Sequence, residues 1–313
     1  MFLFRWGRNS TAIATQLNRN KSTISRELRR NVDAVLKYYS DESAQLRTIH
    51  RRQRASRRPR LKNERIQSYV LDKLDSGWSP EIISGRMKRD LVNDTISPEA
   101  IYQYIYHPTT PERDELIKCL RRAHRHRRTR HIGRQSHNTR ITNRISIHER
   151  SAAVATRDEF GHWEGDSLVS SRSKAALCSL VERQSRLLKL ARVRRRAAKK
   201  IQGAIVKQLG PLPELARQTL TLDNASEHVC HEQVTRTLGI KCYFCDPYSA
   251  WQRATNENMN GLIRWYFPKR TDFGRITQAE IERVELAINS RPRKCLDYRT
   301  PLEAAAPFVA LQH

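Results

Sequence analysis

The hydrophobic pattern of this 313-residue chain changes type at Gly161. Before that residue the apolar side chains recur at the spacing of helices, and after it come short runs typical of strands. "HWEGDSLVS", "KAALCSLVER" and "LLKLARVRR" follow one another closely, as in strands joined by hairpins, and helix and strand patterns then alternate. The chain therefore predicts a multidomain protein, with all-α units first and then an α/β domain, a mixed sheet flanked by helices, over residues 161–313.

Residues 1–60 predict a helix-turn-helix followed by a basic linker. Ile13, Ala14 and Leu17 fall on one helical face, "NRNK" interrupts the pattern, and Ser22 can cap a second helix. Only nine residues precede Ser10, which suggests that this module is truncated. A plain amphipathic hairpin with a basic face is the alternative. In a helix-turn-helix the second helix enters the DNA major groove, so we expect it to supply the DNA contacts: Ser22, Thr23, Arg26, Arg29 and Arg30.

Residues 61–120 predict a second, helix-turn-helix-like DNA-binding domain. Two Ser-Pro-Glu segments, at 79–81 and 97–99, are typical helix starts, with serine as the cap and proline in the first turn. A small bundle that serves only as a spacer is the alternative. The apolar stripe of the first helix consists of Ile66, Val70, Leu71 and Leu74.

Residues 121–160 are polar and basic, and they predict a linker that follows DNA or orders on binding it. The linker contains four histidines, but no cysteine pair stands nearby at the spacing of zinc ligands, so we favour a solvated loop. These histidines are His124, His126, His131 and His137.

Lys and Arg outnumber Asp and Glu by 59 to 32, which gives a net charge of +27. A positive field of this size attracts polyanions, of which nucleic acid is the commonest, although ribosomal and packing proteins are equally basic. No apolar run reaches the roughly 18 residues that a membrane span needs. The opening segment is also too short for a signal peptide. We therefore expect an intracellular protein without a membrane partner, and its six cysteines as reduced thiols.

Three separate elements each carry an acid in this basic chain. Glu164 and Asp166 lie on one side of a predicted strand, because side chains alternate faces. Asp223 ends the strand "TLTLD", and Glu257 lies opposite the apolar stripe of a helix that starts at Trp251. A cation between converging acids would explain them, since carboxylates are the ligands that Mg²⁺ prefers. Two such ions about 4 Å apart suit phosphoryl transfer.

The segments around these acids resemble a known family. "GHWEGDSLVS", "TLDNASEH" and "DPYSAWQRATNENMNGLIRWYFPKRTD" are similar to the transposases of the insertion sequence thirty family, which are DDE recombinases with an integrase-type, ribonuclease H-like core. "STISRELRRN" and "GWSPEIISGRM…ISPEAIYQYIY" resemble that family's two DNA-binding units. The resemblance covers nearly the whole chain, and the 33 residues between Asp223 and Glu257 fit the family's spacing.

The resemblance implies a function and a set of roles. It makes Asp166, Asp223 and Glu257 the catalytic residues and the ligands of two Mg²⁺ ions, for which Mn²⁺ can substitute. The implied reaction is cleavage at the terminal inverted repeats of an insertion sequence, followed by transfer of the freed 3′-hydroxyl to target DNA. It further implies a bacterial, nucleoid-associated protein that acts as an oligomer on DNA. Asn224, Glu227 and Gln252 are the implied active-site support, and the implied DNA contacts here are Arg253, Asn256, Arg264 and Lys269.

Four residues depart from the family pattern. Ala225 and Ala254 stand where glycine is usual, His228 replaces an aromatic residue, and Arg270 replaces a glycine. If the turn at Ala225 needs a positive φ, alanine strains it. These departures leave open a weakened or inactive copy that acts only as a DNA-binding protein or repressor.

Other readings of the residues stay open. A DNA-binding regulator would need no aligned acids, whereas a nuclease without strand transfer would use the same ones. A zinc protein is suggested by Cys242 and Cys245, but residues three apart in a strand point to opposite faces, so buried thiols are preferred. The segment "ARVRRRAAKK", from Ala191 to Lys200, either binds DNA or forms a solvated edge between a strand and a helix.

Overall fold

The computed structural model describes residues 9–32, 39–56, 61, 63–91, 94–120, 141–170, 172–247 and 249–309. The chain forms two compact units, Met1–Asn63 and Glu64–His313. The helices of residues 64–119 thus belong with the sheet, and their assignment as a separate DNA-binding domain stays a prediction. Most of the predicted linker, residues 121–140 with its four histidines, lies outside the described residues. In the described part of the chain, no helix is long and apolar enough to cross a membrane.

The first unit contains α1 (Ser10–Gln16), α2 (Lys21–Asn31) and α3 (Asp41–Ser56). Ile13, Ala14 and Ile24 are packed together between α1 and α2, which confirms the predicted pair of helices. Leu17, predicted to share the apolar face, is instead exposed, because it caps the end of α1 and lies beyond its last turn.

The predicted cap of α2 was also wrong by two residues. Asn20 is the cap, and its side chain accepts a hydrogen bond from the backbone nitrogen of Ser22 at 2.9 Å. Ser22 therefore lies inside the first turn of the helix. Both residue types cap helices well, so the sequence alone could not choose between them.

The second unit starts with four helices, α4 (Glu64–Asp75), α5 (Pro80–Asp90), α6 (Pro98–Tyr106) and α7 (Arg113–Cys119). Ser79 and Ser97 are the caps of α5 and α6, each with proline at the start of the helix, as predicted. Ser97 accepts a hydrogen bond from the backbone of Ala100 at 3.2 Å, whereas Ser79 makes no such side-chain bond. The predicted stripe of α4 is buried at Ile66, Val70 and Leu74, while Leu71 is half-buried.

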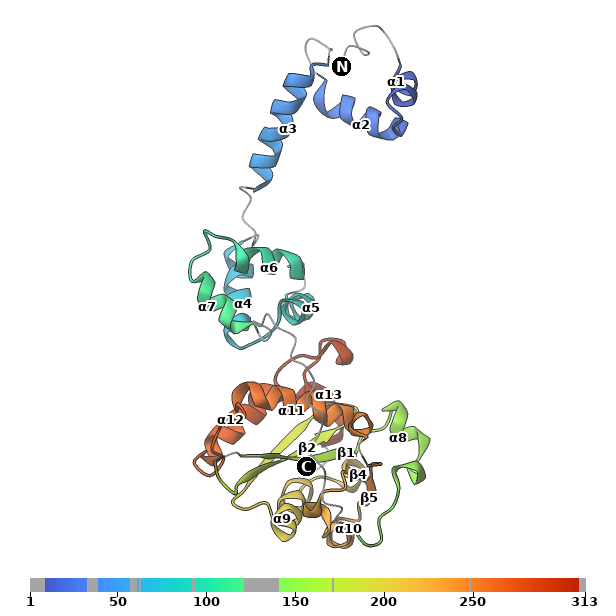
Figure 1. Ribbon diagram of the computed structural model, residues 1–313, viewed down its shortest axis with the longest axis vertical. Coiled ribbons are helices and arrows are strands. Elements are labelled where there is room, and N and C mark those ends of the chain that lie inside the picture. Colours follow the sequence, from blue (N-terminus) through green and yellow to red (C-terminus); the bar gives the residue numbers. More distant parts are fainter. Residues whose placement is uncertain are drawn as a thin grey trace. The chain divides into compact units, whose positions relative to one another are not determined.

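A five-stranded mixed sheet forms the centre of the second unit (Figure 1). Its strands lie in the order β3-β2-β1-β4-β5, with β1 antiparallel to β2, β2 antiparallel to β3, and β1, β4 and β5 parallel. The hairpins of the first three strands match the predicted meander. The strands are β1 (His162–Val169), β2 (Ala176–Glu182), β3 (Leu188–Val193), β4 (Thr219–Leu222) and β5 (Lys241–Phe244).

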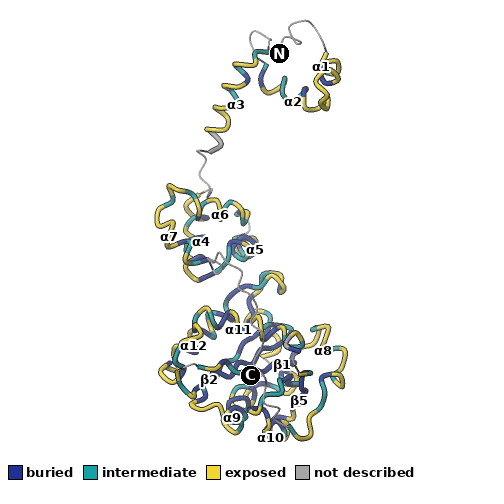
Figure 2. The backbone as a smooth tube through the Cα atoms, in the orientation of Figure 1, coloured by how far each residue is buried: buried dark blue, intermediate teal, exposed yellow. Residues whose placement is uncertain are grey.

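Helices cover both faces of this sheet. On one face, α9 (Ala198–Leu209) and α10 (His231–Leu238) join a core around Trp163. On the other, α11 (Ala254–Tyr266) and α12 (Gln278–Asn289) join a core around Phe273 (Figure 1). β2 between them is buried along its whole length (Figure 2). The mixed sheet flanked by helices is thus confirmed.

Shorter elements connect these layers. The helix predicted from Trp251 is divided, with a 3-10 turn before α11 proper. The remaining elements are η2 (Ile147–Glu149), α8 (Ala152–Thr156), η3 (Glu214–Ala216), η4 (Ser226–His228), η5 (Ala250–Arg253), η6 (Lys294–Leu296) and α13 (Pro301–Val309).

At the outer edge of β3, side chains form hydrogen bonds with the backbone of Leu188 and Leu190. The backbone nitrogen of Leu188 donates to Asn289, which returns a bond to the Leu188 oxygen, both at 2.8 Å. The nitrogen of Leu190 donates to Glu285 at 2.6 Å, and its oxygen accepts from Gln208 at 3.0 Å. Side chains of α9 and α12 therefore satisfy the outward-facing backbone groups of Leu188 and Leu190.

The helical part of the second unit packs against the segment between α12 and α13. Arg86 on α5 makes two 2.7 Å hydrogen bonds to the carboxylate of Glu303 on α13. Gly85 faces the ring of Tyr298, and a Cβ built at Gly85 would lie 2.1 Å from that ring. Asp297 and Tyr298 both have positive φ, at 52° and 58°, a conformation that side chains disfavour. This strained turn lays the tyrosine ring on the glycine.

Candidate active site

Asp166 and Asp223 lie side by side on neighbouring parallel strands. Glu164 of β1 stands opposite Thr221 of β4, so the same register two residues on brings Asp166 beside Asp223. Asp223 directly follows β4, as predicted, and both aspartates are half-buried. The ends of parallel strands meet at one edge of a sheet, which is where ligands gather in such folds.

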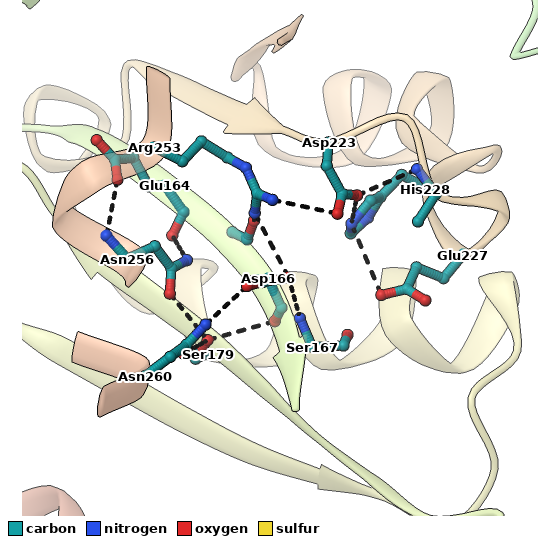
Figure 3. A network of polar contacts seen from close by, with 12 residues as sticks. Glu164, Asp166, Ser167, Ser179, Asp223, Glu227, His228, Arg253, Asn256 and Asn260 are labelled. Carbon is teal, nitrogen blue, oxygen red and sulfur yellow. Dashed lines mark hydrogen bonds and ion pairs between the residues drawn. The ribbon is translucent and has the colours of Figure 1, made fainter. Parts of the chain in front are cut away.

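A single guanidinium joins these two carboxylates (Figure 3). Nη1 of Arg253 lies 3.5 Å from Oδ1 of Asp166, and Nη2 lies 3.2 Å from Oδ2 of Asp223. Nη1 also donates to the backbone oxygen of Gly165 at 2.8 Å. Burial would lower the pKa of Arg253, but the two carboxylates outweigh burial and raise this pKa. A permanent positive charge therefore lies between the two acids.

His228 is a further neighbour of Asp223 (Figure 3). Its Nε2 lies 3.2 Å from Oδ1 of Asp223, which also accepts the backbone N–H of Ala225 at 3.1 Å. Burial would raise the pKa of Asp223, but the contacts with His228 and Arg253 outweigh burial and hold the pKa well below its ordinary value. Asp223 is therefore ionised at neutral pH.

Glu164 is buried and holds the start of α11. Its Oε2 accepts the backbone N–H of Asn256 at 2.9 Å, and its Oε1 lies 3.4 Å from Nη1 of Arg183. Asn256 is itself fully buried and donates to the backbone oxygen of Glu164 at 3.0 Å. The DNA contact predicted for Asn256 does not fit this position, because the amide faces the sheet and no part of it reaches the surface.

Asn260 supports Asp166, a role that the sequence analysis missed. Its Nδ2 donates to Oδ2 of Asp166 at 2.7 Å (Figure 3). Ser179 of β2 lies below and donates to the side-chain oxygens of Asn256 and Asn260, at 3.2 Å each. The spacing of the two asparagines, four residues apart on one helix, was the available signal that both face the sheet.

Glu257 lies in the first turn of α11 and is exposed, away from the buried stripe of Met259, Leu262 and Ile263, as predicted. The structure does not bring it into a compact cluster with the aspartates. Within the described ranges, no group of three or more Asp, Glu, His or Cys side chains is placed so that it could hold a metal ion. The structure thus joins two of the three predicted acids.

Comparisons with known proteins identify the family of the chain. A helix-turn-helix domain model matches residues 3–31. The chain is 42% identical, over 96% of its length and 79% of the relative's, to the transposase InsI for insertion sequence element IS30A of Escherichia coli (strain K12). It is 38% identical, over 96% of its length and 89% of the relative's, to the transposase for insertion sequence element IS1086 of Cupriavidus metallidurans.

The chain belongs to the IS30 family of insertion-sequence transposases. The transposase for insertion sequence element IS4351 of Bacteroides fragilis is 35% identical, over 93% of this chain and 88% of that one. Among solved structures, the catalytic core domain of the BIV integrase matches 46% of this chain and 91% of its own, with 18% identity and a TM-score of 0.37.

The residues predicted to support the active site bond to the loops of this transposase. Asn224 donates from Nδ2 to the backbone oxygen of Cys245 at 2.7 Å. Gln252 holds Asp246, donating to its carboxylate at 2.7 Å and accepting its backbone N–H at 2.8 Å. Glu227 is buried in an ion pair with Arg196. None of these bonds is made to Asp166 or Asp223.

The departures from the family pattern cause no backbone strain at the turn. Ala225 has a φ of −73°, so this position does not need glycine. Ala254 has a φ of −59°, at the start of α11, where alanine is a good helix former. His228, in place of an aromatic residue, contacts Asp223. The strain expected for a positive φ at Ala225 is therefore absent.

The predicted DNA contacts fall in two regions. In the first unit, the five residues of α2 that were predicted to contact DNA all have exposed side chains: Ser22, Thr23, Arg26, Arg29 and Arg30. In the second unit, Lys269 is exposed after α11, whereas Arg264 donates to the backbone oxygen of Val169 at 3.0 Å and stacks 5.5 Å from the ring of Phe273. Burial lowers the pKa of Arg264, which is only partly available to a ligand.

Cys242 and Cys245 are both buried. The hydroxyl of Thr235 lies 3.7 Å from the Cys242 sulfur. Burial raises the pKa of each thiol to about 11. Burial thus favours the neutral thiol at both positions. The zinc interpretation stays disfavoured.

Asp166 and Asp223 fit a divalent cation. They converge on a cationic group already, in the form of Arg253, and Asp223 is held ionised. Their oxygen atoms are the donor type that hard cations prefer. The pair therefore meets the chemical requirement for such an ion, provided that the arginine withdraws.

Proposed function

We propose that this transposase cuts DNA at the terminal inverted repeats of its insertion sequence and joins the cut ends to target DNA. Asp166, Asp223 and Glu257 are the proposed catalytic carboxylates and the ligands of two Mg²⁺ ions, which Mn²⁺ can replace. When bound, such ions make water or a 3′-hydroxyl a better nucleophile and neutralise charge on the leaving oxygen. The observation that carries the proposal is the convergence of Asp166 and Asp223 on one half-buried positive charge, the guanidinium of Arg253.

The chain's own residues prepare this site. Asn260 orients one oxygen of Asp166, and His228 with the Ala225 N–H orients one oxygen of Asp223. Arg253 contacts the other oxygen of each aspartate, and on Asp166 this oxygen, Oδ1, also accepts the backbone N–H of Ser167 at 2.9 Å. Glu257 stands three positions before Asn260, about one turn away on the same helix α11. We propose that Glu257 would complete the ligand set for such ions, with the Arg253 guanidinium turned away from the two aspartates.

The DNA-binding parts have separate proposed roles. The exposed face of α2 reads the terminal repeat through base edges, with arginines at the phosphates. Arg253, once released from the aspartates, and Lys269 contact phosphates near the reacting bond. Residues 61–120 contribute a second DNA-binding domain. Two element ends have to be brought together, so the active species is at least a dimer on DNA, within the nucleoid of a bacterial cell.

Strand transfer is the decisive experiment. Purified transposase is incubated with a labelled fragment of its terminal repeat, a supercoiled target and Mg²⁺, next to Asp223→Asn and a matched control, Glu282→Gln, which removes an exposed carboxylate of α12. We expect joined products from the wild type and the control and none from Asp223→Asn. If the wild type binds the end but neither cuts nor joins it, with Mn²⁺ as well, the protein is only a DNA-binding remnant.

The oligomeric state has its own test. Light scattering of the complex with one terminal repeat should give a mass of at least two subunits. A complex that contains a single subunit would contradict the dimer proposal and leave the chemistry untouched.

A further inference from the structure

A basic groove runs along the outer edge of the sheet, where β3 lies between α9 and α12. It has a volume of about 410 Å³ and is open to solvent. We call it the edge groove. Its lining contains five positive side chains and no carboxylate: Arg192, Arg194, Lys199, Lys200 and Lys207.

The positive charge of the edge groove is not neutralised within the second unit. Arg194, Lys199, Lys200 and Lys207 lie at the surface, and among the residues that the structure describes, none of them lies within ion-pair distance of an acid. Arg192 is fixed differently, because its guanidinium donates to the backbone oxygens of Gly274 and Ile276. Like charges so close repel one another, and a polyanion would relieve that repulsion.

Gly203 gives an independent reason to expect a ligand here. It lies inside α9, where glycine costs about 1 kcal/mol relative to alanine. No packing explains it, because a Cβ at this position would meet nothing within 4 Å. Gly203 lines the groove three residues after Lys200 and four before Lys207, so all three share one helix face. The glycine leaves bare backbone between two lysines, where a bulky anion can approach closely.

The polar groups of the groove suit phosphates better than bases. Two amides line it, but Gln208 donates to the backbone oxygen of Leu190 and Gln278 donates to Glu282, both at 3.0 Å. Lysine and arginine contacts to phosphate position DNA without reading its sequence. The element end has to be recognised by sequence, whereas a target has to be held by its backbone.

A second basic hollow lies next to the groove residues along the chain. Arg195 and Arg196, directly after the groove residue Arg194, line a hollow of about 240 Å³ together with Val169 at the end of β1. β1 is the strand that carries Asp166. Arg196 also forms the ion pair with Glu227, the neighbour of His228. Positive charge thus continues from the sheet edge toward the two aspartates.

We propose that the edge groove binds the phosphodiester backbone of the target DNA, a role that rests on the proposed strand transfer. The test uses the full chain with the double variant Lys200→Gln/Lys207→Gln. Its matched control is Arg236→Gln/Lys241→Gln, which removes two charges from α10 and from β5 at the opposite edge of the sheet. Gly203→Gln adds bulk to the groove without changing its charge. The variant should fold, because a Cβ at this position meets nothing within 4 Å.

The groove variants should cleave the element end at the wild-type rate. The target concentration for half-maximal joining should rise about tenfold at 0.1 M salt. For a duplex without the terminal repeat, we plot the logarithm of the binding constant against the logarithm of the salt concentration. The magnitude of that slope should fall by roughly 2, because each phosphate that a lysine neutralises contributes about 0.9 to it. Gly203→Gln should raise the target requirement too, and the control should do neither.

Two results would overturn the proposal. In the first, the groove variants match the control. In the second, end cleavage falls together with joining, which would place the element end in the groove. If the wild type itself fails to cut and join, the proposed function fails instead. The salt dependence on the duplex without the repeat then decides the groove by itself, because an unchanged slope excludes it as a phosphate site.

Discussion

Two glycines inside helices of the second unit should respond in opposite ways to the same substitution. Gly203→Ala places a methyl group in open space, whereas Gly85→Ala places it 2.1 Å from Cε1 and 2.2 Å from Cζ of Tyr298. Alanine favours the helix at both positions by about 1 kcal/mol. Gly203→Ala should therefore stabilise the unit by about 0.5–1 kcal/mol.

At Gly85 the clash outweighs this gain. The backbone of Tyr298 is held in place, which limits how far the ring can move away. Its nitrogen donates to the backbone oxygen of Arg293 at 2.9 Å, and its backbone oxygen accepts from Nη1 of Arg86 at 3.1 Å. Overpacking of this kind costs about 1–3 kcal/mol. Subtracting the helix gain leaves a net destabilisation of up to about 2 kcal/mol.

Urea denaturation followed by tryptophan fluorescence measures both variants, since Trp78 and Trp163 lie in this unit. A double-mutant cycle with Tyr298→Ala isolates the contact: once the ring is gone, Gly85→Ala should behave like Gly203→Ala. If Gly85→Ala alone stabilises the protein as much as Gly203→Ala, the ring does not rest on this glycine, and the described attachment of α5 is incorrect.

Three further predictions concern charged groups. Arg253→Gln should raise the pKa of Asp223 and strengthen Mn²⁺ binding in calorimetry, because the competing cation is gone. The control Arg264→Gln, in α11, should leave Mn²⁺ affinity unchanged. The hydrogen bonds from Arg86 lower the pKa of Glu303 to about 2. The ion pair therefore stabilises the folded protein fully above the ordinary pKa of 4.5, and this stabilisation is lost as the pH falls toward 2. Solvent screening limits the contribution to about 1 kcal/mol, and Glu303→Gln should flatten that part of the pH–stability curve. In urea denaturation, Glu164→Gln should destabilise the protein by about 3 kcal/mol, because Arg183 loses its buried partner. Glu257→Gln should instead abolish cleavage and leave the stability unchanged. Equal losses of stability in the two variants would show that the two roles are misassigned.

The sequence predicted the parts of the site that depend on local pattern. The alternation around Asp166 and the turn after Asp223 each follow from a few residues, and parallel pairing then brings the two together. The stripe of α11 correctly placed Glu257 on the outside. These features need no knowledge of distant contacts.

Contacts between distant segments could not be predicted in this way. Arg253 looked like a DNA-binding residue, and only the three-dimensional structure shows it between two acids. Asn256 is polar, which suggests exposure, yet its amide satisfies the backbone of β1. The pairing of Gly85 with Tyr298 joins positions more than two hundred residues apart, and no periodicity records it.

The hydrogen-bonded edge of β3 restricts how two copies of the protein can assemble. An edge strand with open N–H and C=O groups invites another chain to extend the sheet, which leads to strand exchange or aggregation. Here Asn289, Glu285 and Gln208 already occupy those groups at Leu188 and Leu190. A partner strand would therefore find no open backbone groups at these two residues of the edge. In the proposed dimer on DNA, contacts at this part of the sheet would therefore form through side-chain surfaces, which separate again without breaking a shared sheet.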